Sequence, residues 1–141
     1  YGKHFVFFAL GNRSANALSV ERLRNERIGV LRSAPEIRQL RKRGFTQVIE
    51  IESLEKMARM LKLGMVAALY GDELMNHCSL QKSGLNVADL TVSLPLETGV
   101  MWLGGSNDIS DAEIASWRDA LKHIRNDKTL ARILSKYHLK E

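Results

Sequence analysis

The sequence predicts an α/β fold: a three-layer arrangement in which helices flank a mostly parallel sheet. The first observation is that β-rich runs alternate with helical patterns from residue 27 to residue 83, as in successive strand–helix–strand units. The second is that residues 66–70 are apolar throughout, as expected of a strand covered on both faces. The third is the length of 141 residues, which suits one domain with a sizeable core.

The first elements follow from β-rich and turn-forming residues. Residues 4–10 form a β-rich run, and the polar residues 11–16 end it as a loop. Ser19 is expected to cap a short turn. Residues 27–31 then form a short buried strand that runs directly into Pro35, a favourable first residue for a helix.

Helix and strand signals continue to alternate through the centre of the chain. Gly44 closes the helix that begins at Pro35, and residues 46–51 are rich in β-branched side chains. Ser53 is a predicted N-cap for the next helix, which Gly64 ends. After the strand at 66–70, a further helix is expected to begin near Glu73 and to stop at Gly84.

The last third of the chain is predicted to contain two extended segments and two helices. The extended segments cover residues 90–96 and 97–103 and are separated near Pro95. Ser110 and Glu113 form a capping box that opens an amphipathic helix. Its apolar side, and that of a final short helix, carry the residues Ile114, Trp117, Leu121, Ile124, Leu130, Ile133, Leu134 and Tyr137.

Charge and composition narrow the function classes. The net charge is +5, but the aromatic residues are only 6% and do not interleave with the basic clusters, so we expect a solvated basic face rather than nucleic-acid binding. Cys78 is the single cysteine and the four histidines lie on different elements, so no metal site and no cofactor are expected. No apolar run approaches the about 20 residues of a membrane-spanning helix.

Two loop ends are the candidate functional region. In an open α/β sheet, ligands collect at the carboxyl ends of strands, where helix N-termini present free N–H groups. Arg32 follows the strand at 27–31, and Asp72 follows the strand at 66–70. A cation and a carboxylate that face one crevice would suit a small zwitterion.

Several phrases of the sequence resemble the family 3 solute-binding proteins, the two-lobed periplasmic receptors that deliver amino acids to ABC importers. The phrases are residues 27–34 (RIGVLRSA), residues 53–57 (SLEKM), residues 61–72 (LKLGMVAALYGD), and the tail with Trp117, Leu121, residues 124–128 and residues 133–137. The resemblance implies a lobe of the type II periplasmic-binding-protein kind. Residues 1–17 would be the first crossover strand and loop, 18–96 the second lobe, and 97–141 the returning crossover with C-terminal helices that pack on a first lobe. Most of that first lobe would lie outside this chain, so we expect a fragment or a shortened relative.

The resemblance also implies a ligand site. Asp72 would receive the α-ammonium group of an amino-acid-like ligand, and Ser33 and Ala34 would stand where the family binds the ligand carboxylate. Ala34 offers no hydroxyl there, and Pro35 removes one N–H group. Arg32 would supply positive charge, and Tyr70 would wall the crevice.

The implied function is reversible capture of a small polar solute in the periplasm, with an ABC permease as partner and no catalytic residue. Three alternatives stay open: an extracellular sensing domain of a receptor kinase, a dehydratase-like enzyme, and a basic nucleic-acid-binding domain. A transmembrane helix after Glu141 would favour the sensor. A second acid or base beside Asp72 would favour the enzyme, and salt-dependent binding of DNA or RNA would favour the nucleic-acid-binding domain. We also expect self-association, because surfaces that normally contact the first lobe would be uncovered.

Overall fold

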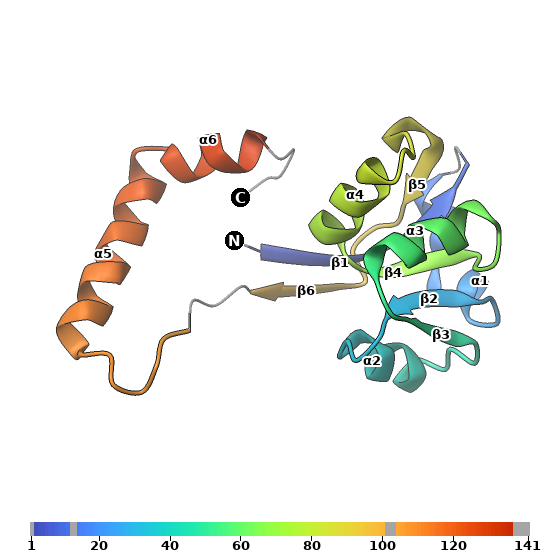
Figure 1. Cartoon of the computed structure of the whole chain (residues 1–141), viewed down its shortest axis with the longest axis horizontal. Coiled ribbons are helices and arrows are strands. Elements are labelled where there is room, and N and C mark those ends of the chain that lie inside the picture. The colour runs from blue at the N-terminus through green and yellow to red at the C-terminus, as the bar shows by residue number, and fades with distance from the viewer. Residues whose placement is uncertain (1, 12–13, 101–103, 137–141) are drawn as a thin grey trace. The chain divides into compact units, whose positions relative to one another are not determined.

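A computed structural model describes residues 2–11, 14–100 and 104–136 (Figure 1). Lys3–Gly99 form the larger of two compact units, which carries the sheet. The described residues after Gly99 belong to the smaller unit, in which helix α5 (Asp111–Asn126) contacts helix α6 (Thr129–Lys136). The division of the sequence at 17/18 and 96/97 stays a prediction.

The larger unit is built on an open mixed sheet with the strand order β3-β2-β4-β1-β5, and β6 pairs with β1. Its strands are β1 (Gly2–Leu10), β2 (Ile28–Leu31), β3 (Val48–Ile51), β4 (Ala68–Asp72), β5 (Leu90–Val92) and β6 (Glu97–Val100). β2 is parallel to both β3 and β4, whereas β1 is antiparallel to β4 and β5. The sheet is therefore mixed: β3, β2 and β4 form the predicted parallel part, and β1 runs in the opposite direction between β4 and β5.

Helices cover both faces of this sheet and complete three layers (Figure 1). One face is covered by the short elements η1 (Ala15–Leu18) and α1 (Val20–Leu23) and by α2 (Glu36–Lys42), which pack around a core that includes Phe7, Ile28 and Tyr70. The other face is covered by α3 (Leu54–Lys62) and α4 (Glu73–Lys82). Burial of apolar side chains on both faces explains the unbroken apolar run near β4.

Local signals place most helix ends correctly. The Ser53 hydroxyl accepts a hydrogen bond from the backbone N–H of Lys56 at 3.2 Å, which caps α3. The predicted capping box of Ser110 and Glu113 is present at the start of α5. Ser19 occupies the N-cap position of α1, but its side chain makes no cap hydrogen bond, so that expected cap interaction is absent.

The ends of two strands differ from those predicted from the sequence. β4 runs to Asp72, two residues beyond the predicted end at residue 70, because β1 pairs alongside it with Phe5 opposite Asp72. β5 ends at Val92, so the predicted extended segment 90–96 is strand only in its first part. Residues 101–103 and Tyr137, which the sequence assigned to a strand and a helix, lie outside the described residues. Within the described ranges, no helix has the length and apolar character needed to cross a membrane.

Candidate ligand-binding site

The candidate site lies where the carboxyl ends of β2 and β4 meet the first turns of the helices. These two strands are parallel neighbours, so their ends reach the same edge of the sheet. A pocket of about 70 Å³ opens there, lined by Val30, Leu31, Ala34, Glu36, Leu54, Met57, Tyr70, Gly71, Asp72, Met75 and Asn76. Ligand pockets usually measure about 300–1,000 Å³, so this pocket by itself is too small to enclose such a ligand.

Asp72 stands at the junction between β4 and α4 and is already engaged on both oxygens. Its Oδ1 accepts a hydrogen bond from the backbone N–H of Met75 at 2.9 Å, which caps α4. Its Oδ2 lies 3.5 Å from Nζ of Lys3, and the Asp72 side chain is only 10% exposed. The carboxylate therefore combines a helix-capping role with an ion pair, at the edge of the pocket.

Tyr70 is a core residue that also lines the pocket. It is 1% exposed, and its ring centroid lies 4.7 Å from that of Phe7. Its hydroxyl has no hydrogen-bond partner among the described residues. Burial, with a smaller contribution from the charge of Glu97, raises the pKa of this phenol well above its ordinary value.

The turn after β2 holds the remaining three candidates, and only Ala34 lines the pocket. The backbone N–H of Ala34 donates to the carbonyl oxygen of Leu31 at 3.2 Å, so that amide closes the turn. Ser33 is exposed and has a left-handed φ of 63°, a conformation that costs a residue with a Cβ about 1–2 kcal/mol. Ser33 and Asp72 thus flank the same edge of the sheet, although Ser33 is not part of the pocket lining.

Arg32 is directed to an ion pair outside the pocket lining. Its Nη2 lies 3.3 Å from Oε1 of Glu52, and Nζ of Lys56 lies 2.6 Å from Oε2 of the same carboxylate. The hydrogen bond from Lys56 is the largest of the causes that lower the pKa of Glu52. Arg32 is therefore paired with a carboxylate at the end of the neighbouring strand β3, which it shares with Lys56.

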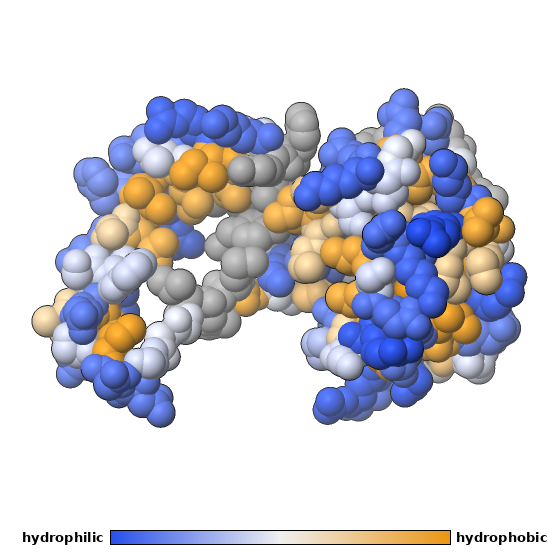
Figure 2. All heavy atoms as spheres, in the orientation of Figure 1, coloured by the Kyte–Doolittle hydropathy of each residue, from blue (hydrophilic) through white to orange (hydrophobic). Residues whose placement is uncertain are grey.

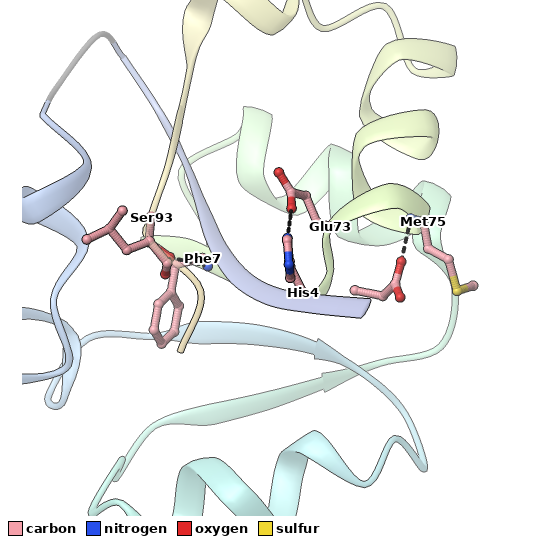
Figure 3. A network of polar contacts seen from close by, with 7 residues as sticks. His4, Phe7, Glu73, Met75 and Ser93 are labelled. Atoms are coloured by element: carbon pink, nitrogen blue, oxygen red, sulfur yellow. Dashed lines mark hydrogen bonds and ion pairs between the residues drawn. The ribbon is translucent and has the colours of Figure 1, made fainter. Parts of the chain in front are cut away.

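Contacts from β1 to the start of α4 were not predicted from the sequence. Beside the contact from Lys3 to Asp72, Nδ1 of His4 lies 3.2 Å from Oε2 of Glu73 (Figure 3). Adjacent basic residues in β1 thus face adjacent acidic residues at the α4 N-terminus. The only signal in the sequence is the charge pattern itself, because the partners are 69 positions apart.

A larger surface groove of about 750 Å³ runs between α3 and α4. It is lined by Leu54, Glu55, Ala58, Arg59, Lys62, Met75, Cys78, Ser79, Lys82 and Ser83. Within the described parts of the chain, no group of three or more histidine, cysteine or acidic residues is placed to hold a metal ion.

The comparisons with known proteins identify the fold. No protein-family model and no curated protein matches the sequence. A histidine kinase sensor domain with similarity to periplasmic binding proteins matches with a TM-score of 0.72 and 16% identity, over 96% of this chain and 59% of that chain. AbpA, an amino acid ABC transporter substrate-binding protein from Streptococcus pneumoniae bound to L-arginine, matches with a TM-score of 0.70 and 14% identity, over 100% and 60%. A mutant of ArgBP from T. maritima matches with a TM-score of 0.73 and 14% identity, over 98% and 58%.

This chain has the periplasmic-binding-protein fold. The match confirms the predicted α/β fold class and, at the level of fold, the resemblance to family 3 receptors. The chain spans 58–60% of the length of these three structures. Within the periplasmic-binding-protein fold, the small pocket at Asp72 lies at a strand-end position where α/β proteins generally bind ligands.

Proposed function

We propose that this chain is the ligand-capturing lobe of a solute-binding receptor for a small, amino-acid-like molecule. The ligand is held between this lobe and a second one, and closure about the crossover strands converts binding into a change of shape. No bond is made or broken, and no residue is assigned a catalytic role. The receptor acts in the periplasm and presents its closed form to an ABC permease.

The observation that carries this proposal is the position of Asp72 in the periplasmic-binding-protein fold. A mostly buried carboxylate at the carboxyl end of β4 borders a pocket that is open to one side. Hydrogen bonds to charged groups contribute about 1.5–3 kcal/mol, so a ligand ammonium at this carboxylate would be a main source of affinity. Ala34 and Tyr70 line the same pocket, and the turn after β2 carries Ser33 and Arg32 beyond the residues that line it.

A sensing role is the second candidate. It is favoured by the match to the histidine kinase sensor domain, which covers nearly all of this chain. The two roles share the same ligand chemistry and differ in the partner that recognises the closed state, an ABC permease for transport or a signalling kinase for sensing. The gene sequence beyond Glu141 distinguishes them, because a sensor continues into a membrane-spanning helix.

Self-association belongs to the same proposal. Helix α5 exposes Ile114, Trp117 and Leu121, and α6 exposes Ile133 (Figure 2). Such an apolar face normally contacts another protein surface. We propose that a first lobe covers it in the whole receptor, and that copies of the isolated chain associate through it.

The experiment is a ligand-observed saturation-transfer NMR screen of the L-amino acids against the wild-type chain and Asp72→Asn. The substitution keeps the side-chain shape and the capping oxygen but removes the charge. We expect a subset of amino acids to give a signal with the wild type and a signal about tenfold weaker with the variant. No signal from any amino acid with either protein, or equal signals with both, would contradict the proposal.

A further inference from the structure

The carboxylate at the centre of the candidate site already holds an ammonium group that belongs to the chain itself. Nζ of Lys3 lies 3.5 Å from Oδ2 of Asp72. The other carboxylate oxygen accepts the backbone N–H of Met75 at 2.9 Å. An incoming ammonium group therefore meets a carboxylate with both oxygens engaged, and only the contact to Lys3 can be exchanged without opening the first turn of α4.

The sheet register places Lys3 at this position. β1 is antiparallel to β4, with Phe5 opposite Asp72, and Lys3 lies two residues before Phe5 in β1. Residues two apart on a strand share one face, so the Lys3 side chain leaves the sheet on the same side as Phe5. The contact is thus a consequence of the strand pairing and not of a chance surface encounter.

Two neighbouring basic side chains contact other carboxylates and not Asp72. Arg32 pairs with Glu52 at 3.3 Å, and His4 contacts Glu73 at 3.2 Å. The Lys3 side chain is 28% exposed, whereas the Asp72 side chain is 10% exposed. A long flexible side chain that reaches from solvent to a nearly buried carboxylate can leave it at low cost, since partly exposed ion pairs are weak.

We infer that Lys3 is a specificity-determining residue that competes with the ligand's ammonium group for Asp72 and selects against ligands with a second positive charge. This inference rests on the proposed role of Asp72 in ligand binding. When a ligand takes the carboxylate, the displaced Lys3 ammonium stays beside the site because its backbone is fixed in β1. This ammonium group then repels a ligand with a cationic side chain and attracts a ligand with an anionic one, so the site favours acidic amino acids over basic ones.

The size of the effect follows from simple electrostatics. Two like charges about 6 Å apart in largely solvated surroundings, with an effective dielectric constant of about 40–80, change affinity by about three- to tenfold. Competition alone lowers the affinity for every ammonium-bearing ligand by the fraction of molecules in which Lys3 occupies Asp72. Removal of the Lys3 charge therefore strengthens arginine binding more than it strengthens glutamate binding.

The test compares L-glutamate and L-arginine by NMR titration of the wild type, Lys3→Met, Lys3→Arg and the control Lys62→Met. Lys62 carries the same charge on α3 but does not line the pocket, so Lys62→Met controls for net charge. We expect the wild type to bind glutamate more tightly than arginine. Lys3→Met should raise the affinity for arginine relative to that for glutamate by about tenfold or more, because repulsion of one ligand and attraction of the other are both removed, while Lys3→Arg and Lys62→Met keep the wild-type ratio.

The outcomes separate the two claims. If both amino acids bind and Lys3→Met leaves their ratio unchanged, the role of Lys3 is wrong and the proposed function stands. If Lys3→Met weakens both ligands equally, Lys3 contacts the ligand directly and does not compete with it. If neither the wild type nor Lys3→Met binds any amino acid, the proposed function fails, and the inference fails with it.

Discussion

Asp72 holds the first turn of α4 through a hydrogen bond that its Oδ1 accepts from the backbone N–H of Met75 at 2.9 Å (Figure 3). The same carboxylate is the proposed anchor for a ligand ammonium. A substitution at this position changes helix stability and ligand affinity together, unless the replacement keeps the capping oxygen. The two roles are therefore separable by the choice of side chain.

Asp72→Asn and Asp72→Ala are expected to differ in stability. Asparagine caps helices about as well as aspartate, whereas alanine leaves an N–H group without a partner at a cost of about 1 kcal/mol. We expect urea unfolding to show Asp72→Ala about 1–2 kcal/mol less stable than the wild type, with Asp72→Asn losing less than half of that. An equal loss in both variants would show that the charge, and not the cap, is what Asp72 contributes to folding.

Gly29 is predicted to be intolerant of a side chain. It lies in β2, between β3 and β4, and a Cβ there would come within 2.8 Å of both Ile51 Cδ1 and Leu69 Cδ2. Overpacking of this kind costs about 1–3 kcal/mol. Gly29→Ala should lower the free energy of unfolding by that amount in a urea titration. Gly2→Ala is the control, because a Cβ at Gly2 meets no atom within 4 Å, and equal stability of the two variants would contradict the packing account.

The apolar face of α5 is expected to drive self-association. Trp117 is 58% exposed and lies between Ile114 and Leu121 on one side of the helix. Light scattering coupled to size exclusion should show a mass that rises with concentration, and Trp117→Ser should weaken the association about tenfold or more. Arg118→Ser, on the adjacent exposed position, should leave it unchanged. A wild type that stays monomeric at high concentration would refute this expectation.

The capping box of α5 should be visible in a carboxyl titration. The Ser110 hydroxyl is 2.7 Å from Oε2 of Glu113, and hydrogen bonds from its side chain and then its backbone lower the pKa of Glu113. Because the pKa of Glu113 is lowered in the folded state, its ionised carboxylate stabilises the fold at pH values above the ordinary glutamate pKa. This stabilisation is lost as the pH falls through the folded-state pKa. Ser110→Ala should raise the pKa of Glu113 in a carbon-detected NMR titration.

Ser106→Ala provides the matched control for this titration. The Ser106 hydroxyl bonds Asp108 and lowers the pKa of that carboxyl, so its removal should raise the Asp108 value and leave Glu113 unchanged. A Glu113 pKa that does not respond to Ser110→Ala would contradict the capping-box account.

Features that depend on local chemistry were predictable from the sequence. Ser53 and Ser110 were identified as caps because a cap requires only a hydroxyl and a helix start that lie a few residues apart. The alternation of strands and helices likewise predicted the α/β class, because each strand–helix unit is short and self-contained. The fold match confirms that class.

Features that depend on distant pairing were not predictable. β4 ends at Asp72 and not at Tyr70, because β1, from the start of the chain, pairs beside it. The same pairing brings Lys3 to Asp72, and Arg32 turns to Glu52 through a contact between neighbouring strand ends. A sequence alone gives the charges of such residues but not which carboxylate each cation meets.

The most direct test of the central claim is a ¹H–¹⁵N NMR titration of the wild-type chain with L-glutamate. Binding at the carboxyl ends of β2 and β4 predicts saturable shift changes that cluster at Ala34, Gly71, Asp72 and Asn76, with a dissociation constant on the order of 1 mM, since one lobe supplies part of the contacts. Shift changes confined to the groove between α3 and α4, around Arg59 and Lys82, would contradict the account. So would the absence of saturable changes at the pocket up to about 50 mM ligand.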